Sequence, residues 1–252
     1  MTQRPQVPTG LAGALGDGRP VTPRPASTVL LVDQAVRPWR LLMMRRPGGA
    51  DFAPGAYVFP GGSHHTEDAE FADPARAAGI RELFEEVGVL LARRPNGRFA
   101  RDRECVRLRT LLADGSGWVA ALSEVGLTVA LDRLTFLARW VTPEPVRRRF
   151  DTRFYLARRP AGQTIHPQAG EVDDWLWISP GEALEPGGPS LVHATRRVLE
   201  SVASEPDPGR LIARLRRRRE TPPVVPQIRP RPGGGFDVLD DARPPASSGD
   251  GR

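Results

Sequence analysis

Short apolar runs with turn residues on both sides recur through the middle of the chain, a pattern typical of strands. Ser27–Asp33 and Trp39–Arg45 are the first two, joined by a turn around Arg37-Pro38. We expect further strands at 56–59, 135–141, 150–157 and 175–178. Because stretches with helical spacing separate these runs, the pattern predicts an α/β or α+β domain.

Three stretches carry apolar residues at helical spacing. The first opens with Asp73-Pro74, an N-cap residue followed by a proline at the first helical position, and ends at Gly88. The second, 102–131, is expected to be mostly helical. The third, 190–203, has a single apolar stripe, which predicts an amphipathic closing helix.

The two ends of the chain are rich in proline and glycine and bury too little apolar surface to offset the entropy of ordering. We therefore predict a flexible segment over 1–25, one globular domain over 26–205 and a loose tail over 206–252. Within the tail, two short apolar runs flank Gly233–Gly235 and leave open whether a hairpin forms there.

The net charge of +6 raises the question of a nucleic-acid partner. All 36 basic residues are arginine, but residues 26–205 carry 23 arginines and 23 acidic residues. The predicted domain is thus neutral, which argues against a nucleic-acid-binding core. The run Arg216–Arg219 is interpreted as a solvated face, with contact to RNA or a membrane surface as the alternative.

Other features of the composition suggest a compartment. Cys105 is the single cysteine, so no internal disulfide can form, and we expect it to be a core residue. No apolar run is long enough to cross a membrane, and no secretory signal is recognisable at the N-terminus. We therefore expect a cytoplasmic protein without membrane contact.

Three carboxylates mark the most distinctive chemistry. Glu82, Glu85 and Glu86 are spaced i, i+3 and i+4, which places them on one face of the helix predicted at 73–88. Like charges this close repel unless a cation lies among them, either Arg81 or a bound hard metal ion. Oxygen ligands favour Mg²⁺ or Mn²⁺, but a solvated acidic face is the alternative that spacing alone leaves open.

The order of residues around these carboxylates resembles a known signature. Gly61-Gly62, followed after a loop by Arg81-Glu82-Leu83-Phe84-Glu85-Glu86-Val87-Gly88-Val89, is similar to the box of the Nudix hydrolases, which cut diphosphates linked to another moiety. The resemblance implies an α/β/α sandwich with a mixed β-sheet. It also implies that Glu82, Glu85 and Glu86 hold Mg²⁺ or Mn²⁺ and act in catalysis, and that Arg81 is a structural ion-pair partner.

The first half of the signature departs from the family pattern. Six or seven residues are inserted between the glycines and Arg81, so either Glu67 or Asp68, or neither, takes the place of the first glutamate. An enlarged loop here and a helical insertion at about 102–131 resemble the peroxisomal-type acyl-coenzyme A diphosphatases. Phe59-Pro60-Gly61-Gly62 after Gly55 also matches the coenzyme A signature of that branch, although Asp51 stands where a second arginine is expected.

The branch resemblance implies a reaction and further site residues. Coenzyme A or an acyl-coenzyme A would be cut to 4'-phosphopantetheine, or its acyl form, and adenosine 3',5'-bisphosphate. The implied substrate-binding residues are Arg46, Gly61, Gly62, Arg149 and Arg153. Glu171 is the candidate general base outside the box, with a box glutamate as the alternative.

Several alternatives remain at this point. One is hydrolysis of ADP-ribose or another nucleoside diphosphate derivative; others are a nucleotide- or RNA-binding module and hydrolysis at an RNA 5'-end. A small-molecule diphosphate is the expected partner, nucleic acid is not favoured, and the oligomeric state, including a homodimer, is open. His64 and His65 are interpreted as an exposed loop pair, with a metal role as the alternative.

Overall fold

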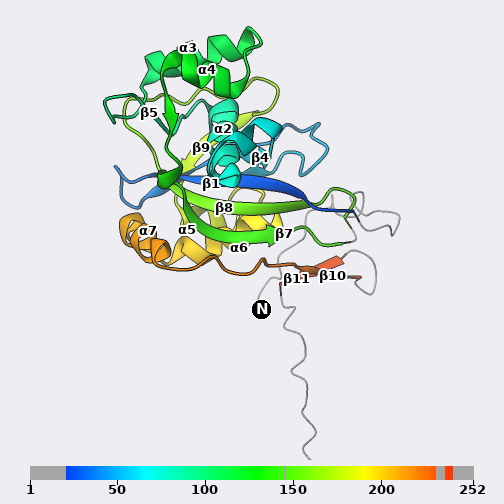
Figure 1. Ribbon diagram of the computed structural model, residues 1–252. Coiled ribbons are helices and arrows are strands. Elements are labelled where there is room, and N and C mark those ends of the chain that lie inside the picture. Colours follow the sequence, from blue (N-terminus) through cyan, green and yellow to red (C-terminus); the bar gives the residue numbers. More distant parts are fainter. Residues whose placement is uncertain (1–20, 145, 231–235, 241–252) are drawn as a thin grey trace, which may run out of the picture.

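The computed structural model describes residues 21–144, 146–230 and 236–240. Its centre is a mixed seven-stranded sheet in which five strands follow the order β3-β2-β1-β8-β7, while β4 pairs with β1 and β9 with β2 (Figure 1). The long central strand β1 (Arg24–Asp33) runs antiparallel to β2 (Arg40–Arg45) and parallel to β8 (Phe150–Arg158). The mixed sheet predicted from the resemblance is confirmed.

The other strands are shorter. In the main sheet they are β3 (Tyr57–Val58), β4 (Gly61–Ser63), β7 (Thr135–Val141) and β9 (Asp174–Ile178). Two small sheets are formed by β5 (Ala92–Arg93) with β6 (Thr128–Val129), and by β10 (Gln227–Pro230) with β11 (Phe236–Leu239). The strand expected at 56–59 is reduced to two residues, and the chain then pairs again as β4, which the apolar pattern did not predict because Gly61-Gly62 carries no side chains.

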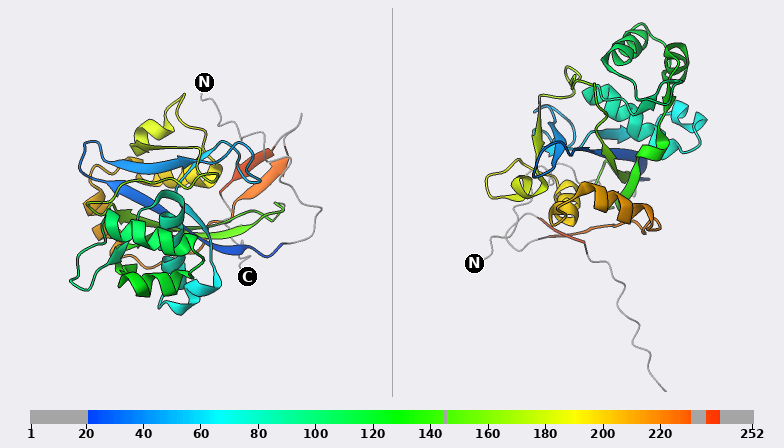
Figure 2. Two further views of the ribbon diagram at one scale, coloured as in Figure 1. Left: turned by 90° about the horizontal axis from the view of Figure 1, so that it is seen from above. Right: turned by 90° about the vertical axis from the view of Figure 1, so that its left-hand side faces the viewer.

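One face of the sheet is covered by α2 (Pro74–Val87), and α3 (Asp102–Ala113) and α4 (Trp118–Val125) lie on the far side of α2 (Figures 1 and 2). Two 3₁₀ turns, η1 (Thr66–Glu70) and η2 (Leu131–Arg133), flank these helices. A single apolar core joins the layers, with Leu31 of β1, Phe84 of α2 and Trp118 of α4 among its members. Cys105 is buried in this core, as expected.

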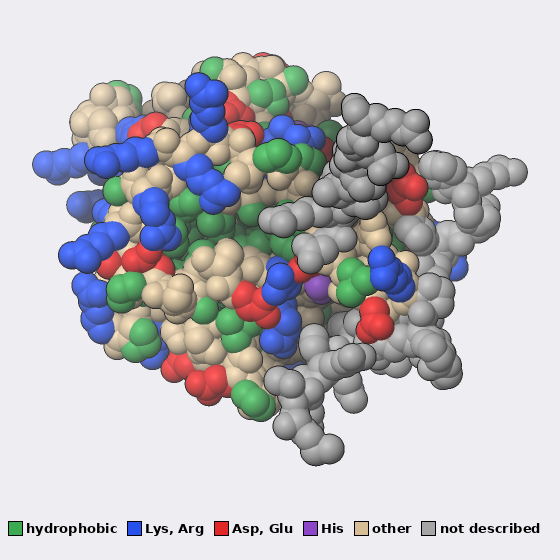
Figure 3. All heavy atoms as spheres, turned by 90° about the horizontal axis from the view of Figure 1, so that it is seen from below, with side chains coloured by type: hydrophobic (Ala, Val, Ile, Leu, Met, Phe, Trp, Pro, Cys, Tyr) green, Lys and Arg blue, Asp and Glu red, His purple; other side chains and the backbone are tan. Residues whose placement is uncertain are grey.

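The opposite face of the sheet is covered by α5 (Pro180–Leu184), α6 (His193–Ala203) and α7 (Pro208–Arg216). Leu30 and Val32 alternate with the residues that face α2 and pack against these helices. Viewed from this side, arginines gather at the edge over α7 (Figure 3), where Arg210, Arg214 and Arg217–Arg219 are exposed. The predicted sandwich of helices on both faces of a sheet is therefore what the structure shows.

The C-terminal region differs from the loose tail expected beyond residue 205. Leu211, Ile212 and Leu215 of α7 are buried in the second core, and Asp207 caps the helix by accepting a bond from the Gly209 N–H. The packed structure thus continues to residue 216. β10 and β11 pair antiparallel as a hairpin, and its glycines at 233–235 lie outside the described residues, as do residues 1–20 of the expected flexible segment.

The helix that carries the three glutamates begins and ends as predicted. Asp73 accepts a hydrogen bond from the Arg76 N–H at 3.1 Å, and Gly88 adopts a left-handed conformation with φ 74°. The region 102–131 is divided into α3 and α4 by a turn at 114–117. In the described part of the chain, no helix combines the length and apolar character that crossing a bilayer requires.

Candidate active site

Helix α2 places its three glutamates beside β4. Ile80 and Leu83 are buried in the core that includes Leu31 of β1, and Phe84 packs against Trp118 of α4, so contacts with both neighbouring layers fix the rotation of the helix. With the rotation fixed, Glu82, Glu85 and Glu86 lie along the edge that faces the Gly61–Ser63 strand. The face predicted from the i, i+3, i+4 spacing therefore borders a strand instead of open solvent.

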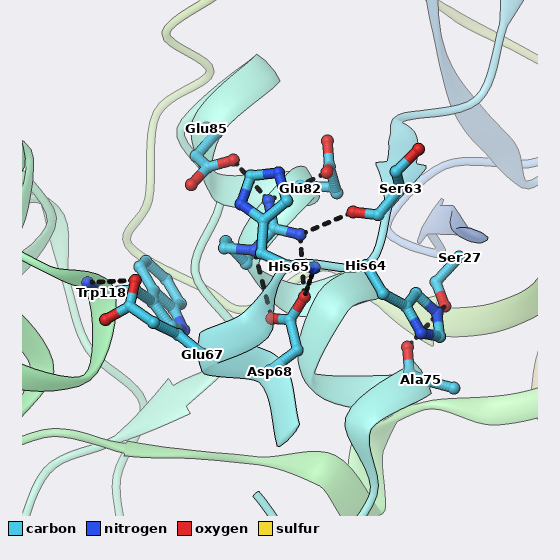
Figure 4. Close-up of polar contacts among 11 residues, drawn as sticks. Ser27, Ser63, His64, His65, Glu67, Asp68, Ala75, Glu82, Glu85 and Trp118 are labelled. Atoms are coloured by element: carbon cyan, nitrogen blue, oxygen red, sulfur yellow. Dashed lines mark hydrogen bonds and ion pairs between the residues drawn. The ribbon is translucent and has the colours of Figure 1, made fainter. Parts of the chain in front are cut away.

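Arg81 is the centre of a polar network whose partners Ser63, Asp68, Glu82 and Glu85 are labelled in Figure 4. Its side chain is 1% exposed, and its Nη1 donates to Glu82 Oε1 at 2.9 Å and to Glu85 Oε2 at 2.8 Å. Its Nη2 donates to the Ser63 carbonyl oxygen at 2.8 Å. Burial alone would lower the pKa of Arg81, but the bond to Asp68 and the surrounding carboxylates raise it, so the guanidinium stays charged.

Asp68 and Glu67, which the sequence left as alternatives, have different roles. Asp68 is fully buried and receives two bonds from Arg81, Nε to Oδ1 at 3.1 Å and Nη2 to Oδ2 at 2.9 Å. Its Oδ2 also accepts the His65 N–H at 2.7 Å. Glu67 points the other way and accepts the Trp118 N–H at 3.2 Å. Asp68 is thus the acid that orders Arg81.

The two glycines of the signature are required by close packing. The Gly61 N–H donates to Glu86 Oε2 at 2.7 Å. A Cβ on Gly61 would lie 2.4 Å from the Ser27 carbonyl oxygen, and one on Gly62 would lie 2.5 Å from Glu82 Oε2. A side chain at Gly61 would separate β4 from the backbone of β1, and one at Gly62 would displace the Glu82 carboxylate.

The environment of the glutamates disfavours their charged forms. Burial raises the pKa of Glu82 to about 7, although Arg81 opposes the shift. Burial also raises the pKa of Glu85, and it raises the pKa of Glu86 well above its usual range, with Glu82 adding repulsion. Three carboxylates, those of Asp68, Glu82 and Glu85, share the Arg81 guanidinium, and Glu86 lies beside them on the Gly61 N–H, so the cluster has unmet negative charge.

A distant loop closes the C-terminal end of α2. The Gln168 N–H donates to the Glu86 carbonyl oxygen at 2.8 Å, and the His166 N–H donates to that of Val87 at 2.9 Å. Glu171, three residues further on, is exposed and near enough for its charge to raise the pKa of Glu86. The structure therefore brings the Glu171 loop to the cluster, which no local sequence pattern could show.

The arginines predicted to bind substrate divide into three cases. Arg46 donates from Nε to the Phe52 carbonyl oxygen at 2.9 Å, and its charge acts on Glu86 to lower the pKa, so it borders the cluster. Arg153 lies on β8, where its charge acts on His64 and its Nε is 4.0 Å from a Glu220 carboxylate oxygen. It faces the α2 side of the sheet, beside His64.

The third arginine, Arg149, is buried. This side chain is 8% exposed and donates to two carbonyl oxygens, those of Thr142 at 2.9 Å and Val21 at 2.8 Å. It ties the start of the domain to the β7–β8 loop through these two bonds. The basic run at 147–149 gave no sign of this because burial is a property of the tertiary structure.

The two histidines, expected to be an exposed loop pair, have different environments, and only His64 departs from that expectation. Ser27 Oγ donates to the Ala75 carbonyl oxygen at 2.6 Å, so it accepts from Nε2 of His64 at 3.0 Å. The His64 side chain is half-buried at this contact, and burial lowers the pKa of its imidazole. His65 is exposed, with its ring on the Glu85 side of the network (Figure 4).

The donor set fits a hard divalent cation. Its side chains offer oxygen atoms, as Mg²⁺ and Mn²⁺ prefer, and their burial makes an added positive charge favourable. Among the described residues no three His, Cys, Asp or Glu side chains are already arranged as a metal site. Glu82 and Glu85 each direct one carboxylate oxygen to Arg81 Nη1, so these two oxygens are not directed at a shared metal position.

An acidic helix beside a glycine strand, on an α/β/α sandwich, is the arrangement that the resemblance to the Nudix box predicted. No protein-family model matches the chain. A solved structure of a NUDIX hydrolase from Alicyclobacillus acidocaldarius aligns with 76% of the chain and 96% of its own length, with 28% identity and a TM-score of 0.65.

Curated proteins agree with this structural likeness. Nudix hydrolase 7 of Caenorhabditis elegans is 32% identical over 162 residues, which are 64% of this chain and 53% of that protein. Acyl-coenzyme A diphosphatase NUDT19 of Homo sapiens is 26% identical over 68% of this chain and 60% of its own length. The chain is thus similar to Nudix hydrolases in sequence and in fold, and it spans about 53 to 60% of the length of these curated relatives.

Proposed function

We propose that the protein is a divalent-cation-dependent hydrolase of organic diphosphates. The observation that carries this proposal is a cluster of three glutamates whose charged forms burial disfavours: Glu82 and Glu85 are bonded to the buried Arg81, and Glu86 accepts the Gly61 N–H. A binding module would gain stability by losing these mutually repelling carboxylates. Their retention, together with the Asp68 bonds that order Arg81, supports hydrolysis.

Glu82, Glu85 and Glu86 would hold Mg²⁺ or Mn²⁺. The bound cation would neutralise diphosphate oxygens and lower the pKa of a bound water. Within the protein, Arg81 keeps Glu82 and Glu85 oriented, and the Gly61 N–H keeps Glu86 oriented. The proton of the attacking water would pass to a box glutamate or to Glu171, whose loop is bonded to the end of α2.

Coenzyme A or an acyl-coenzyme A is the substrate that we favour. The partial coenzyme A signature at 55–62 and the name of the human relative support this choice. Arg46 is the arginine best placed for a diphosphate oxygen, since its charge already acts on Glu86. Arg153 remains a proposed contact for a peripheral phosphate, and the products would be 4'-phosphopantetheine, or its acyl form, and adenosine 3',5'-bisphosphate.

The test measures release of adenosine 3',5'-bisphosphate from coenzyme A with Mg²⁺ or Mn²⁺, with ADP-ribose as a parallel substrate. Glu85→Gln should lower kcat by about 100-fold or more, because the amide cannot supply the charge that a cation requires. Glu70→Gln is the matched control, because Glu70 is exposed on η1.

The outcomes separate the levels of the proposal. Glu85-dependent turnover of coenzyme A would support both the reaction and the substrate. Turnover of ADP-ribose alone would retain the hydrolase and replace the substrate. Wild-type turnover that survives Glu85→Gln, or that persists after chelation of divalent cations, would contradict the proposed site.

A further inference from the structure

Helix α4 of the insertion begins without a capping side chain of its own. Its N-cap residue is Gly117, which offers no side-chain oxygen for the free N–H groups of the first turn. Glu67, from the loop before α2, supplies that oxygen instead. Its Oε2 accepts the Trp118 N–H at 3.2 Å, and its Oε1 lies 3.5 Å from the Val119 nitrogen.

Gly117 is also the residue that lets Glu67 approach. A Cβ on Gly117 would lie 2.6 Å from Glu67 Oε1, closer than non-bonded atoms can pack. The carboxylate thus lies directly against the helix start, where the partial positive charge of the N-terminus favours an anion. The contact is specific to this pair of residues because a side chain at Gly117 would displace it.

The residue next to Glu67 reaches in the opposite direction. Figure 4 shows Glu67 directed to Trp118 and Asp68 directed to the Arg81 network, from one turn of η1. Asp68 holds Arg81 through Nε and Nη2, and Arg81 Nη1 in turn bonds Glu82 and Glu85. A continuous chain of contacts therefore runs from the insertion to the carboxylates.

The short length of η1 makes the two contacts interdependent. Glu67 and Asp68 are consecutive residues of a five-residue 3₁₀ turn, so a rotation that releases one carboxylate displaces the other. If Asp68 moves, Arg81 loses the buried partner that directs its Nε and Nη2. The guanidinium would then bind Glu82 and Glu85 more tightly and compete with a divalent cation for their oxygens.

We propose that Glu67 is a positioning residue that links the helical insertion to the catalytic carboxylates. By anchoring η1 to α4, it keeps Asp68 on Arg81 and so keeps Glu82 and Glu85 available to the cation. The inference rests on the proposed function, because it assigns a structural cause to the cation affinity of that site. The insertion is accordingly part of the catalytic apparatus.

The first test compares Mn²⁺ binding, followed by the paramagnetic resonance of free Mn²⁺, with turnover at increasing Mn²⁺. Glu67→Ala should raise the Mn²⁺ dissociation constant about 10-fold and raise the Mn²⁺ concentration for half-maximal turnover by the same factor. At saturating Mn²⁺ the activity should return, with KM for the diphosphate unchanged. A merely structural loss would lower turnover equally at all Mn²⁺ concentrations.

Two matched variants identify the cause. Glu67→Gln keeps an oxygen that accepts the Trp118 N–H and should recover most of the Mn²⁺ affinity. Glu70→Ala changes an exposed residue of the same turn and should leave Mn²⁺ binding at the wild-type value. Equal losses in Glu67→Ala and Glu70→Ala would overturn the proposal.

A second substitution disturbs the same contact from the α4 side. It provides the test if Glu67→Ala fails to fold. Gly117→Ala leaves Glu67 in place but obstructs it, so it should weaken Mn²⁺ binding to a similar extent. Both substitutions break the same contact between Glu67 and the start of α4. The double variant should therefore bind Mn²⁺ no more weakly than the single variant with the lower Mn²⁺ affinity.

The outcomes distinguish this inference from the proposed function. Wild-type Mn²⁺ binding that is unchanged in Glu67→Ala and in Gly117→Ala would overturn the positioning role and leave the hydrolase proposal intact. Additive losses in the double variant would also overturn it, because they require two separate effects. A wild-type chain that binds no Mn²⁺ would overturn the proposed function and this inference together.

Discussion

Arg81 illustrates how one buried side chain can set the chemistry of its neighbours. It reaches Asp68, Glu82 and Glu85 from within the helix that also carries the glutamates. Removing a single partner from such a network is costly, because the remaining buried charge loses its compensation. The free glutamate oxygens therefore lie in a rigid, poorly solvated setting, which suits the binding of a cation.

The raised pKa of Glu82 predicts how the stability of the metal-free protein depends on pH. The folded pKa of about 7 exceeds the ordinary value of 4.5, so the folded state binds the proton more tightly than the unfolded chain. The free energy of unfolding should therefore fall as pH rises from about 4.5 to about 7, and then level off. The contribution of Glu82 is at most about 3 kcal/mol.

Urea unfolding at pH 5 and pH 8, with a chelator present, measures this effect. Glu82→Gln should lose less stability than the wild type between the two pH values. Added Mg²⁺ should restore wild-type stability at pH 8, because a bound cation favours the charged carboxylates. A wild type whose pH dependence equals that of Glu82→Gln would contradict the assignment.

At the scale of elements, α2 is the best specified part of the chain. Its start at Asp73, its end at Gly88 and its buried face all follow from local sequence, and the structure confirms each of them. The turn after α2 is nevertheless shaped by tertiary contacts. A Cβ on Gly88 would lie 2.5 Å from Arg109 Nη2 and 3.0 Å from the His166 Cβ.

Gly88→Ala should therefore destabilise the protein more than an alanine at an open glycine. Gly97 is the matched control, because its φ of 77° is close to the 74° of Gly88 and nothing lies within 4 Å of a Cβ there. Gly97→Ala should cost about 1 kcal/mol for the left-handed backbone. Gly88→Ala should cost at least 1 kcal/mol more, through crowding. Urea midpoints test this, and equal losses would argue against the packing role.

The insertion shows the limit of prediction at this scale. The apolar pattern predicts helix over most of 102–131, and α3 and α4 confirm it, but the turn at 114–117 was not resolved from sequence. Asp114-Gly115-Ser116-Gly117 is a local turn signal that the helical prediction passed over, whereas the cap of α4 comes from Glu67, some fifty residues earlier. Local sequence contains no signal for a cap that arrives from another part of the chain.

For the whole molecule, the two cores on opposite faces of the sheet decide where the packed structure ends. α7 completes the second core with Leu211, Ile212 and Leu215, although its outward surface is dominated by arginine. Composition averaged over 206–252 concealed this short amphipathic helix among prolines and glycines. In the part that the structure describes, Arg210, Arg214 and Arg216 lie on this helix, and Arg217–Arg219 follow it directly.

Leu211→Ala should lower the free energy of unfolding by about 2 to 5 kcal/mol, because it removes a side chain that is 2% exposed from the second core. Arg210→Ala, one residue earlier, is the control. Its side chain is 83% exposed, and its ion pair with Asp207 is long, at 3.9 Å. We therefore expect the free energy of unfolding to change by no more than about 0.5 kcal/mol. Thermal and urea unfolding of both variants measure the difference. Equal stability of Leu211→Ala and wild type would show that α7 is dispensable for the core.

The sequence alone determined the features that depend on neighbouring residues. It predicted the main strands, the caps of α2 and the alignment of Glu82, Glu85 and Glu86, because periodicity and capping act over a few residues. The resemblance of residues 61–89 to the Nudix box added a predicted family and fold to these local features. The solved structure from Alicyclobacillus acidocaldarius supports this prediction.

Only the tertiary structure decided which distant groups complete the site. It assigned Asp68 to Arg81 and Glu67 to α4, buried Arg149 in a structural role and brought the Glu171 loop to the end of α2. These assignments depend on burial and on hydrogen bonds between segments far apart in the chain. A residue's type limits which bonds it can form, but the packing of the sheet and helices determines which partner it meets.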